Sequence, residues 1–447
     1  MTDLLRAKLP RRLALMLLPL AATGCESLQN LFEDTPKVPI PGIRIPVIPN
    51  ARGVMVDNAR GVKIRLPAPT ERADWPQPGG SASHEAGHIQ VADQLAEAWK
   101  ADIGRSAGYR HKIPATPVVA DGRVFTIDPD GLIRAFDLAK GDRLWEFDTT
   151  PEDDDNSNLG GGVSVAAGTV YVATGRSELI ALEAATGKLQ WRQPLMSSAR
   201  SAPTIADGKL FIALLGNTVE ALDAKDGHHI WSYQGKQSIT SMLGLPAPAY
   251  ADGLLVAGFG SGELLALRAS TGAVVWLDNL AAVQGTSSNA DLSAIHGLPV
   301  IQDGRVYAVS LGGLMLALDL RSGRRLWERD ITSGDNPCIA GGFIFVLTSD
   351  SQLVALDRTD GSIIWVTQLD KWANKEKKRD AIFWTGPVLA GDRLVVVSGI
   401  GTAQAVSPYT GEVLGEQELS GPAVLPPIVA AGTLLVLTDD AKLIALR

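Results

Sequence analysis

The stretch from Leu298 to Trp327 decides the fold and reads LPVIQDGRVYAVSLGGLMLALDLRSGRRLW. Two of its segments, 305–310 and 314–319, consist mainly of apolar, branched and aromatic residues and have glycines near their ends. Such runs lack the 3.6-residue periodicity of a helix and are typical of strands. The loop after Asp319 indicates a hairpin, because aspartate accepts backbone N–H groups and Gly323 tolerates a positive φ. The stretch therefore predicts a small antiparallel sheet.

The same frame recurs along the chain as a proline, a glycine, an Ala-Leu-Asp run, a second glycine and a tryptophan. Its alanines are Ala135, Ala181, Ala221, Ala266, Ala317, Ala355, Ala405 and Ala445. Successive alanines are 46, 40, 45, 51, 38, 50 and 40 residues apart. This spacing is close to the ~40–45 residues of a four-stranded propeller blade. We therefore expect an all-β fold, an eight-bladed β-propeller of four-stranded antiparallel blades.

The ring is predicted to close with strands from both ends of the sequence. The last copy of the frame contains only three strands, and a matching fourth strand with Trp99 precedes the first copy. We expect this N-terminal strand to complete the last blade, because closure hides the sheet edges.

Tryptophans at the end of the frame are predicted to pack between blades, since each buries ~150–250 Å². They are Trp99, Trp145, Trp191, Trp231, Trp276, Trp327 and Trp365. The seventh copy has Gly415 at this position. We expect Trp372 or Trp384 to fill that gap.

The N-terminus has the pattern of an export signal. Residues 1–24 combine basic residues with a short apolar run, too short to span a bilayer, which needs ~20 residues. The run ends in Ala-Thr-Gly-Cys, which resembles a bacterial lipobox and predicts acylation of Cys25. An ordinary secretory signal is the alternative. Glu26 follows the cysteine, where an aspartate is associated with inner-membrane retention, so outer-membrane anchoring that faces the periplasm is favoured.

Three further regions follow the signal. Residues 25–70 are interpreted as the acylated N-terminus and a tether, in which the proline-rich segment 36–49 favours extended polyproline II. Residues 71–94 form a lead-in segment, and residues 95–447 form the propeller.

Composition excludes several classes of protein. The chain of 447 residues has 41 basic and 49 acidic residues and a net charge of -8, so no nucleic-acid partner is expected. Its two cysteines, Cys25 and Cys338, are too few for a disulfide scaffold or a multi-cysteine zinc module.

The sequence His84-Glu85-Ala86-Gly87-His88 fits the zincin motif H-E-x-x-H. That chemistry requires both histidines on one helical face. Nearby prolines and glycines do not favour a helix, so we expect no metal and no catalytic residue here, but a polar loop packed on the propeller. The basic segment 371–379 is interpreted as a solvated insertion or as a contact for an acidic partner or anionic lipid.

Partner binding is predicted on the connections between blades, because their length varies while the blades are nearly constant. Two connections carry apolar residues, and the candidate contacts are Met242, Leu243, Leu245, Leu292, Ile295 and His296. The alternative is that these residues fold back onto the ring.

From about residue 95 to the end, the frame resembles the PQQ-like repeat propellers. This superfamily includes quinoprotein dehydrogenases and the BamB family of outer-membrane assembly lipoproteins. The lipobox-like segment, the tether, the eight repeats and the length resemble the BamB family. The dehydrogenases are usually longer and have adjacent cysteines and a calcium site, and neither feature is found in this sequence.

The resemblance implies a non-catalytic periplasmic scaffold lipoprotein of the β-barrel assembly (BAM) complex, which aids folding and insertion of outer-membrane proteins. Its implied partners are the POTRA domains of the barrel insertase BamA and other BAM lipoproteins. It implies no cofactor, a lipid anchor in the outer membrane and a monomer within a hetero-complex. The alternative is a PQQ-dependent dehydrogenase or a degenerate quinoprotein. A carbohydrate-binding propeller is a third possibility, supported only by the fold.

Overall fold

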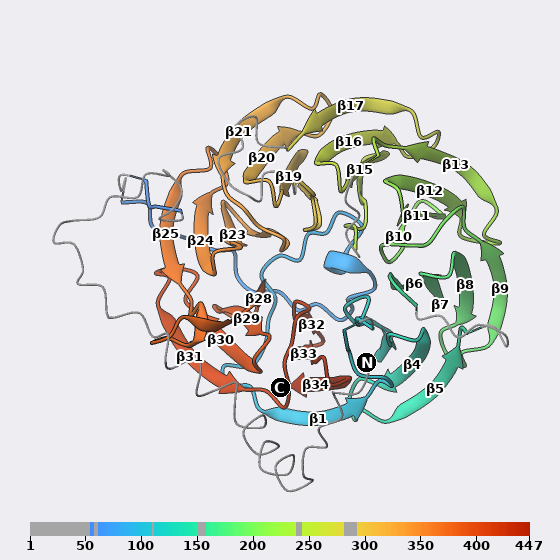
Figure 1. The fold of residues 1–447 in the computed structure, drawn as a ribbon, viewed down its shortest axis with the longest axis horizontal. Coiled ribbons are helices and arrows are strands. Elements are labelled where there is room, and N and C mark those ends of the chain that lie inside the picture. The colour runs from blue at the N-terminus through green and yellow to red at the C-terminus, as the bar shows by residue number, and fades with distance from the viewer. Residues whose placement is uncertain (1–53, 58–60, 110, 151–157, 238–243, 281–292) are drawn as a thin grey trace, which may run out of the picture. The chain divides into compact units, whose positions relative to one another are not determined.

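The computed structural model describes residues 54–57, 61–109, 111–150, 158–237, 244–280 and 293–447. These residues form eight four-stranded sheets and one two-stranded sheet. Figure 1 shows the eight sheets as blades of a ring, with one strand of each blade next to the centre and one at the rim. The predicted eight-bladed β-propeller is confirmed.

Each blade has four strand positions, and the blades are numbered 1 to 8 along the chain by their innermost strands. The innermost strands are β2 (Val118–Ala120), β6 (Gly161–Ala166), β10 (Thr204–Ala206), β14 (Ala249–Ala251), β18 (Val300–Gln302), β22 (Cys338–Ala340), β28 (Trp384–Leu389) and β32 (Ile428–Ala430). The second strands are β3 (Arg123–Ile127), β7 (Thr169–Thr174), β11 (Lys209–Leu214), β15 (Leu254–Gly258), β19 (Arg305–Val309), β23 (Phe343–Leu347), β29 (Leu394–Ser398) and β33 (Thr433–Leu437).

The third strands carry the alanines of the repeat. They are β4 (Leu132–Asp137), β8 (Glu178–Glu183), β12 (Thr218–Asp223), β16 (Glu263–Arg268), β20 (Leu314–Asp319), β24 (Gln352–Asp357), β30 (Thr402–Val406) and β34 (Lys442–Leu446). The outermost strands are β5 (Arg143–Asp148), β9 (Leu189–Pro194), β13 (His229–Gln234), β17 (Val274–Asn279), β21 (Arg325–Asp330), β25 (Ile363–Gln368), β31 (Val413–Glu418) and β1 (Glu97–Asp102). A small hairpin, β26 (Trp372–Asn374) and β27 (Arg379–Ala381), lies in the basic segment.

Blade 8 combines the two ends of the described chain. Its order is β1-β34-β33-β32, and β1 pairs antiparallel with β34, with Trp99 opposite Ala445. The predicted closure of the last blade by an N-terminal strand is confirmed.

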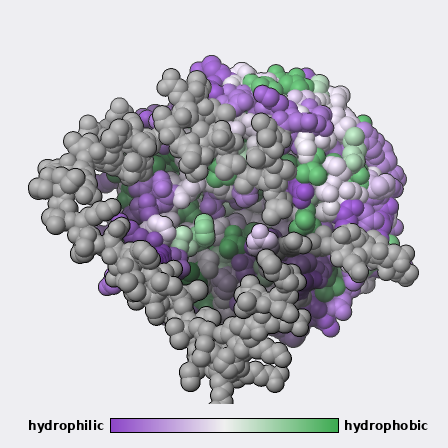
Figure 2. Space-filling model, viewed as in Figure 1, coloured by the Kyte–Doolittle hydropathy of each residue, from purple (hydrophilic) through white to green (hydrophobic). Residues whose placement is uncertain are grey.

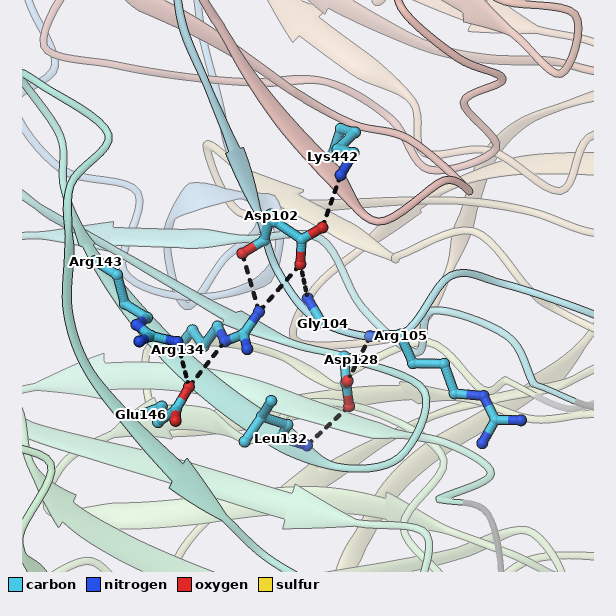
Figure 3. Close-up of polar contacts among 9 residues, drawn as sticks. All are labelled: Asp102, Gly104, Arg105, Asp128, Leu132, Arg134, Arg143, Glu146 and Lys442. Carbon is cyan, nitrogen blue, oxygen red and sulfur yellow. Dashed lines mark hydrogen bonds and ion pairs between the residues drawn. The ribbon is translucent and has the colours of Figure 1, made fainter.

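Ionic contacts join this closing blade to blade 1 (Figure 3). The Asp102 carboxylate in β1 accepts from Lys442 Nζ at 2.7 Å and from Arg134 Nη1 at 3.1 Å. Arg134 also reaches Glu146 at 3.2 Å. Partial burial acts to raise the pKa of Asp102, but the hydrogen bonds from Lys442 and the Gly104 N–H and the nearby cations hold that pKa below its ordinary value.

The tryptophan at the third position of an outermost strand packs against the following blade. In blade 1, the Trp145 indole N–H donates to the Ala184 carbonyl of blade 2 at 3.0 Å. Its ring covers Gly187, where a Cβ atom would lie 2.6 Å from the indole. The same contact recurs in the pairs Trp99–Gly141, Trp191–Gly227, Trp231–Gly272, Trp276–Gly323, Trp327–Gly361 and Trp365–Gly411. Each glycine has a positive φ, so both the backbone and the ring require glycine there.

Blade 7 has no tryptophan of this kind, and the expectation that Trp372 or Trp384 replaces it is wrong. A Cβ atom at Gly415 would have no atom within 4 Å. Trp384 instead begins the innermost strand β28, and its indole N–H donates to the Asp370 carbonyl at 2.8 Å. The physical reason is that the third and outermost strands of blade 8 are not consecutive, so no turn glycine faces Gly415.

The lead-in segment crosses the centre of the ring and contains the short helical turn η3 (Pro78–Gly80), visible at the centre of Figure 1. Its backbone is hydrogen-bonded to residues in, or directly after, the innermost strands of several blades. The pairs are Trp75 with Val119, Pro76 with Val165, Ala82 with Tyr250, Ser83 with Ile301 and Arg72 with Ala431. This segment therefore closes the hub and ties blades together that are distant in the sequence.

Candidate functional site

A funnel opens at the centre of one face of the propeller. This funnel face is formed by the connections between blades and by the turns between second and third strands. The funnel has a volume of about 480 Å³. Each blade contributes lining residues at or before the start of its innermost strand, including Ile113, Leu159, Arg200, Leu245, Leu298, Asn336, Trp384 and Leu425. The lead-in residues Trp75 and His84 line the same funnel, so the lead-in segment contributes to its inner wall.

Polar groups in the funnel are few and are held by neighbouring protein atoms. The Asp335 carboxylate accepts from Thr385 Oγ1 at 2.6 Å and from the Gly386 N–H at 3.2 Å. Burial raises the pKa of Asp335 to about 6, although these hydrogen bonds act to lower it. His296 is exposed, and its Nδ1 lies 2.9 Å from the Gly334 carbonyl oxygen.

The two histidines of the H-E-x-x-H motif do not lie on a helix. His84 has a φ of 61°, and its buried Nδ1 donates to the Pro299 carbonyl at 2.7 Å. Nδ1 of His88 donates to the Pro67 carbonyl at 2.8 Å, while its Nε2 accepts the Asp392 N–H at 3.1 Å. Both ring nitrogens of His88 are therefore hydrogen-bonded to backbone atoms. His84 and His88 do not form the zincin arrangement.

The funnel residues do not fit a quinone and calcium site of the dehydrogenase type. The lining contains one carboxylate among the described residues, that of Asp335, whereas calcium takes six to eight oxygen ligands. The described lining also contains a single cysteine, Cys338. Burial raises the pKa of its thiol to about 12, so the thiol stays protonated and unreactive.

The structure separates the six predicted partner contacts into three groups. Met242, Leu243 and Leu292 lie outside the described residues. The prediction that Ile295 contacts a partner is wrong, because its side chain has no exposed surface and packs in the core between blades 4 and 5. Leu245 is half-buried at the funnel wall, and His296 is exposed beside it.

An exposed apolar surface on blades 2 and 3 was not predicted from the sequence. Met196 is 64% exposed, Leu159 37% and Leu215 36%. These residues are joined through the connection between the two blades, because Ser197 Oγ donates to the Leu215 carbonyl at 3.2 Å and Arg200 donates to the Leu159 carbonyl. We call Leu159, Met196 and Leu215 the blade 2–3 patch. Its signal in the sequence was the Leu195-Met196 pair directly after an outermost strand.

A second exposed apolar group lies on the same face at blade 7. Phe383 is 72% exposed, Ile400 51% and Val424 45%, and Phe383 and Val424 both approach Gly399. Figure 2 shows hydrophobic residues interspersed with hydrophilic ones on this view of the molecule. Exposed apolar groups on one face are typical of a protein-binding surface.

A comparison with protein families identifies the family to which the chain belongs. Residues 87–158, 129–367 and 370–447 match the family model described as outer membrane protein assembly factor BamB. The chain belongs to this family. The relationship predicted from the repeat frame is therefore confirmed.

Individual BamB proteins cover the same region. The outer membrane protein assembly factor BamB of Yersinia pestis is 29% identical over 346 residues, which are 76% of this chain and 85% of that protein. The crystal structure of BamB from Moraxella catarrhalis has a TM-score of 0.66 at 20% identity and covers 79% of this chain and 100% of that one.

An enzyme shares the fold. The quinohemoprotein alcohol dehydrogenase from Comamonas testosteroni has a TM-score of 0.61 at 16% identity and covers 81% of this chain and 76% of that one. At this identity the likeness concerns the propeller alone.

Proposed function

We propose that this protein is a non-catalytic scaffold in the assembly of outer-membrane β-barrel proteins. It is held at the outer membrane by acylated Cys25, faces the periplasm and binds the POTRA domains of BamA and other BAM lipoproteins. The observation that carries the proposal is the match of the whole propeller to the BamB family. The proposed domain boundaries are a signal at 1–24, the tether at 25–70, the lead-in at 71–94 and the propeller at 95–447.

The absence of catalysis is supported by the composition of the funnel. It contains one carboxylate and one protonated thiol among the described lining residues, without the ligand set for calcium. The exposed apolar groups lie on its rim, where a protein domain reaches them. These features favour binding of protein over turnover of a small substrate.

We assign the main contact with the POTRA domains to the blade 2–3 patch. Leu245 extends this patch towards the funnel, because its N–H donates to the Arg200 carbonyl at 3.0 Å. Met242, Leu243 and Leu292 remain proposed contacts in the neighbouring connections. Apolar residues at the centre of an interface contribute most of its binding energy.

The double variant Met196→Glu/Leu215→Glu tests this assignment. Truncated or charged hot-spot residues cost ~2 kcal/mol or more, so affinity for purified POTRA domains is expected to fall at least ~30-fold by surface plasmon resonance. The matched control is Leu144→Glu/Leu189→Glu, which places the same charges on outermost strands where these side chains are 46% and 44% exposed. Equal affinities of the two double variants would reject this patch as the contact.

The anchor is tested separately. Membrane attachment is assigned to Cys25 because the Ala-Thr-Gly-Cys segment resembles a lipobox. Among the described residues, no helix is long and apolar enough to cross a bilayer. In the Met196→Glu/Leu215→Glu background, where the proposed POTRA contact is weakened, replacement Cys25→Ser should move the protein from the membrane fraction to the soluble periplasm, because the acyl chains supply the affinity. Retention of the unmodified variant in washed outer membranes would contradict the lipid anchor.

A further inference from the structure

The joint between blades 7 and 8 differs from the other seven joints of the ring. At those joints a tryptophan covers a turn glycine of the next blade. Here Gly415 takes the tryptophan position, and the two outer strands of blade 8, β34 and β1, are not joined by a turn. Both halves of the usual contact are therefore missing. Figure 1 shows β31 and β1 as the outermost strands on either side of this joint.

The missing contact leaves an open groove. In the other seven blades the repeat alanine of the third strand has no exposed surface, whereas Ala405 of blade 7 is only half-buried. Gly415 pairs with Ala405. Of the eight outermost strands that the structure describes, β31 is the one in which every residue is exposed, and the others bury or half-bury their tryptophan. We call the surface formed by Ala405, Gly415 and Gln417 the seam groove.

The strand beside the seam groove is acidic. From Glu412 to Glu418 the sequence is EVLGEQE, with three carboxylates and no basic residue. Side chains alternate between the faces of a strand. Gly415 and Gln417 therefore share the face towards blade 8, while Glu416 and Glu418 share the opposite face. Gln404 Nε2 donates to Glu416 Oε1 at 2.7 Å and orients that carboxylate along the strand.

We propose that the free edge of β31 binds an extended segment of a partner protein as a fifth strand. The segment has an aromatic side chain opposite Gly415 and basic side chains opposite Glu416 and Glu418. An edge strand offers unpaired N–H and C=O groups for this pairing. Aromatic side chains stabilise a sheet by covering a cross-strand glycine, and opposite charges in directly opposed positions add further stability.

The same charges disfavour pairing of β31 with the β31 strand of a second copy of this chain. Two β31 strands in antiparallel pairing would bring glutamates of one strand near glutamates of the other, and like charges in cross-strand pairs are destabilising. The partner segment is therefore predicted to read basic, any residue, basic, aromatic across Glu418, Gln417, Glu416 and Gly415. This surface is separate from the blade 2–3 patch.

A labelled peptide tests the proposal. The probe is a fluorescein-labelled peptide that contains Lys-Thr-Lys-Trp-Val-Thr, titrated with the purified full chain and followed by fluorescence anisotropy. Saturable binding is expected. It should weaken at least tenfold when alanine replaces the peptide's tryptophan, and at least tenfold when glutamates replace its lysines. Absence of binding, or equal binding of the three peptides, would overturn the proposal.

Variants of the protein locate the site. Gly415→Trp fills the seam groove from within the chain, and Glu416→Lys/Glu418→Lys reverses the charge on the opposite face of β31, so each should weaken binding of the probe at least tenfold. The matched control is Leu277→Lys, at the position of β17 equivalent to Glu416, where the side chain is 52% exposed. It should bind within twofold of the wild type.

Two further comparisons complete the test. If Gly415→Trp does not fold, as judged by its thermal melt, the charge-reversed variant Glu416→Lys/Glu418→Lys alone tests whether the peptide binds at β31. The variant Met196→Glu/Leu215→Glu should bind the probe normally, which separates the seam groove from the proposed POTRA contact. Unchanged binding by the charge-reversed variant would show that the peptide binds elsewhere.

Discussion

The Trp365 indole of blade 6 lies over Gly411 of blade 7. A Cβ atom at Gly411 would lie 2.8 Å from the indole and 2.6 Å from Thr367 Oγ1, and the glycine has a φ of +76°. Both the missing Cβ atom and the left-handed backbone are therefore needed for the blades to meet. This contact repeats around the ring and stops at Gly415, four residues further along the chain.

The two glycines should respond differently to the same substitution. Gly411→Ala adds a methyl group against the indole and strains the backbone, so it should lower the free energy of unfolding by ~1–3 kcal/mol. Gly415→Ala meets no atom within 4 Å and should change stability by less than ~0.5 kcal/mol. Urea unfolding measures both. Equal losses would mean that the ring does not depend on the tryptophan–glycine contact.

Closure of the ring is predicted to depend on packing more than on charge. Trp99→Ala removes the indole over Gly141 and the hydrogen bond to the Leu138 carbonyl, so it should cost ~2–4 kcal/mol. Lys442→Met breaks an ion pair with Asp102 whose side chains are 37% and 53% exposed, so it should cost less than ~1 kcal/mol. Thermal unfolding of the two variants compares them, and a larger loss for Lys442→Met would contradict this ranking.

His84 should make the protein less stable in acid. Burial lowers the pKa of His84 to about 4 from 6.5. Between these values the unfolded chain binds a proton that the folded chain does not bind, so stability falls as the pH drops from 6.5 to 4. The loss is ~3 kcal/mol at most.

The variant His84→Asn isolates this effect, because asparagine tolerates the left-handed backbone at this position. Denaturant unfolding from pH 4 to pH 7 should give a smaller pH slope for the variant than for the wild type, whatever its stability at pH 7. An unchanged slope would show that His84 is not the group responsible.

Asp335 should have the opposite pH dependence. Burial raises the pKa of Asp335 from its ordinary value of 3.8 to about 6. Between these pH values the folded protein keeps a proton on this carboxyl group that the unfolded chain has released. Stability is therefore lost as the pH rises from about 4 through 6. Asp335→Asn keeps an acceptor for Thr385 and should be more stable than the wild type at pH 7.5 by ~1–2 kcal/mol. The control is Asp93→Asn, an exposed carboxyl, and equal effects of the two variants would contradict the assignment.

Removal of metal should leave the protein unchanged. Both ring nitrogens of His88 are hydrogen-bonded to the backbone, so neither is free for zinc. Treatment with EDTA is expected to shift the melting temperature by less than about 1 °C. Stoichiometric zinc in the purified protein that is lost on His84→Ala would contradict this expectation.

The repeat frame was sufficient to predict the blades, their number and the strand that closes the ring. Strand alternation, turn residues and tandem spacing are local properties of the sequence, and each blade repeats them. The sequence was not sufficient to predict that Ile295 is buried. Periodicity does not indicate on which side of a connection an apolar residue lies, and Ile295 turned inward against Gly258 in the core.

The candidate surfaces were decided by the tertiary structure. The blade 2–3 patch brings together Leu159 and Leu215, which are 56 positions apart in the sequence. The seam groove exists because blade 8 is assembled from both ends of the chain. The sequence alone determined the sheet module and its tandem repetition, since these depend on neighbouring residues. Only the closed ring decided which side chains meet across the hub, the funnel and the joints, because these contacts depend on distances between blades that no local pattern encodes.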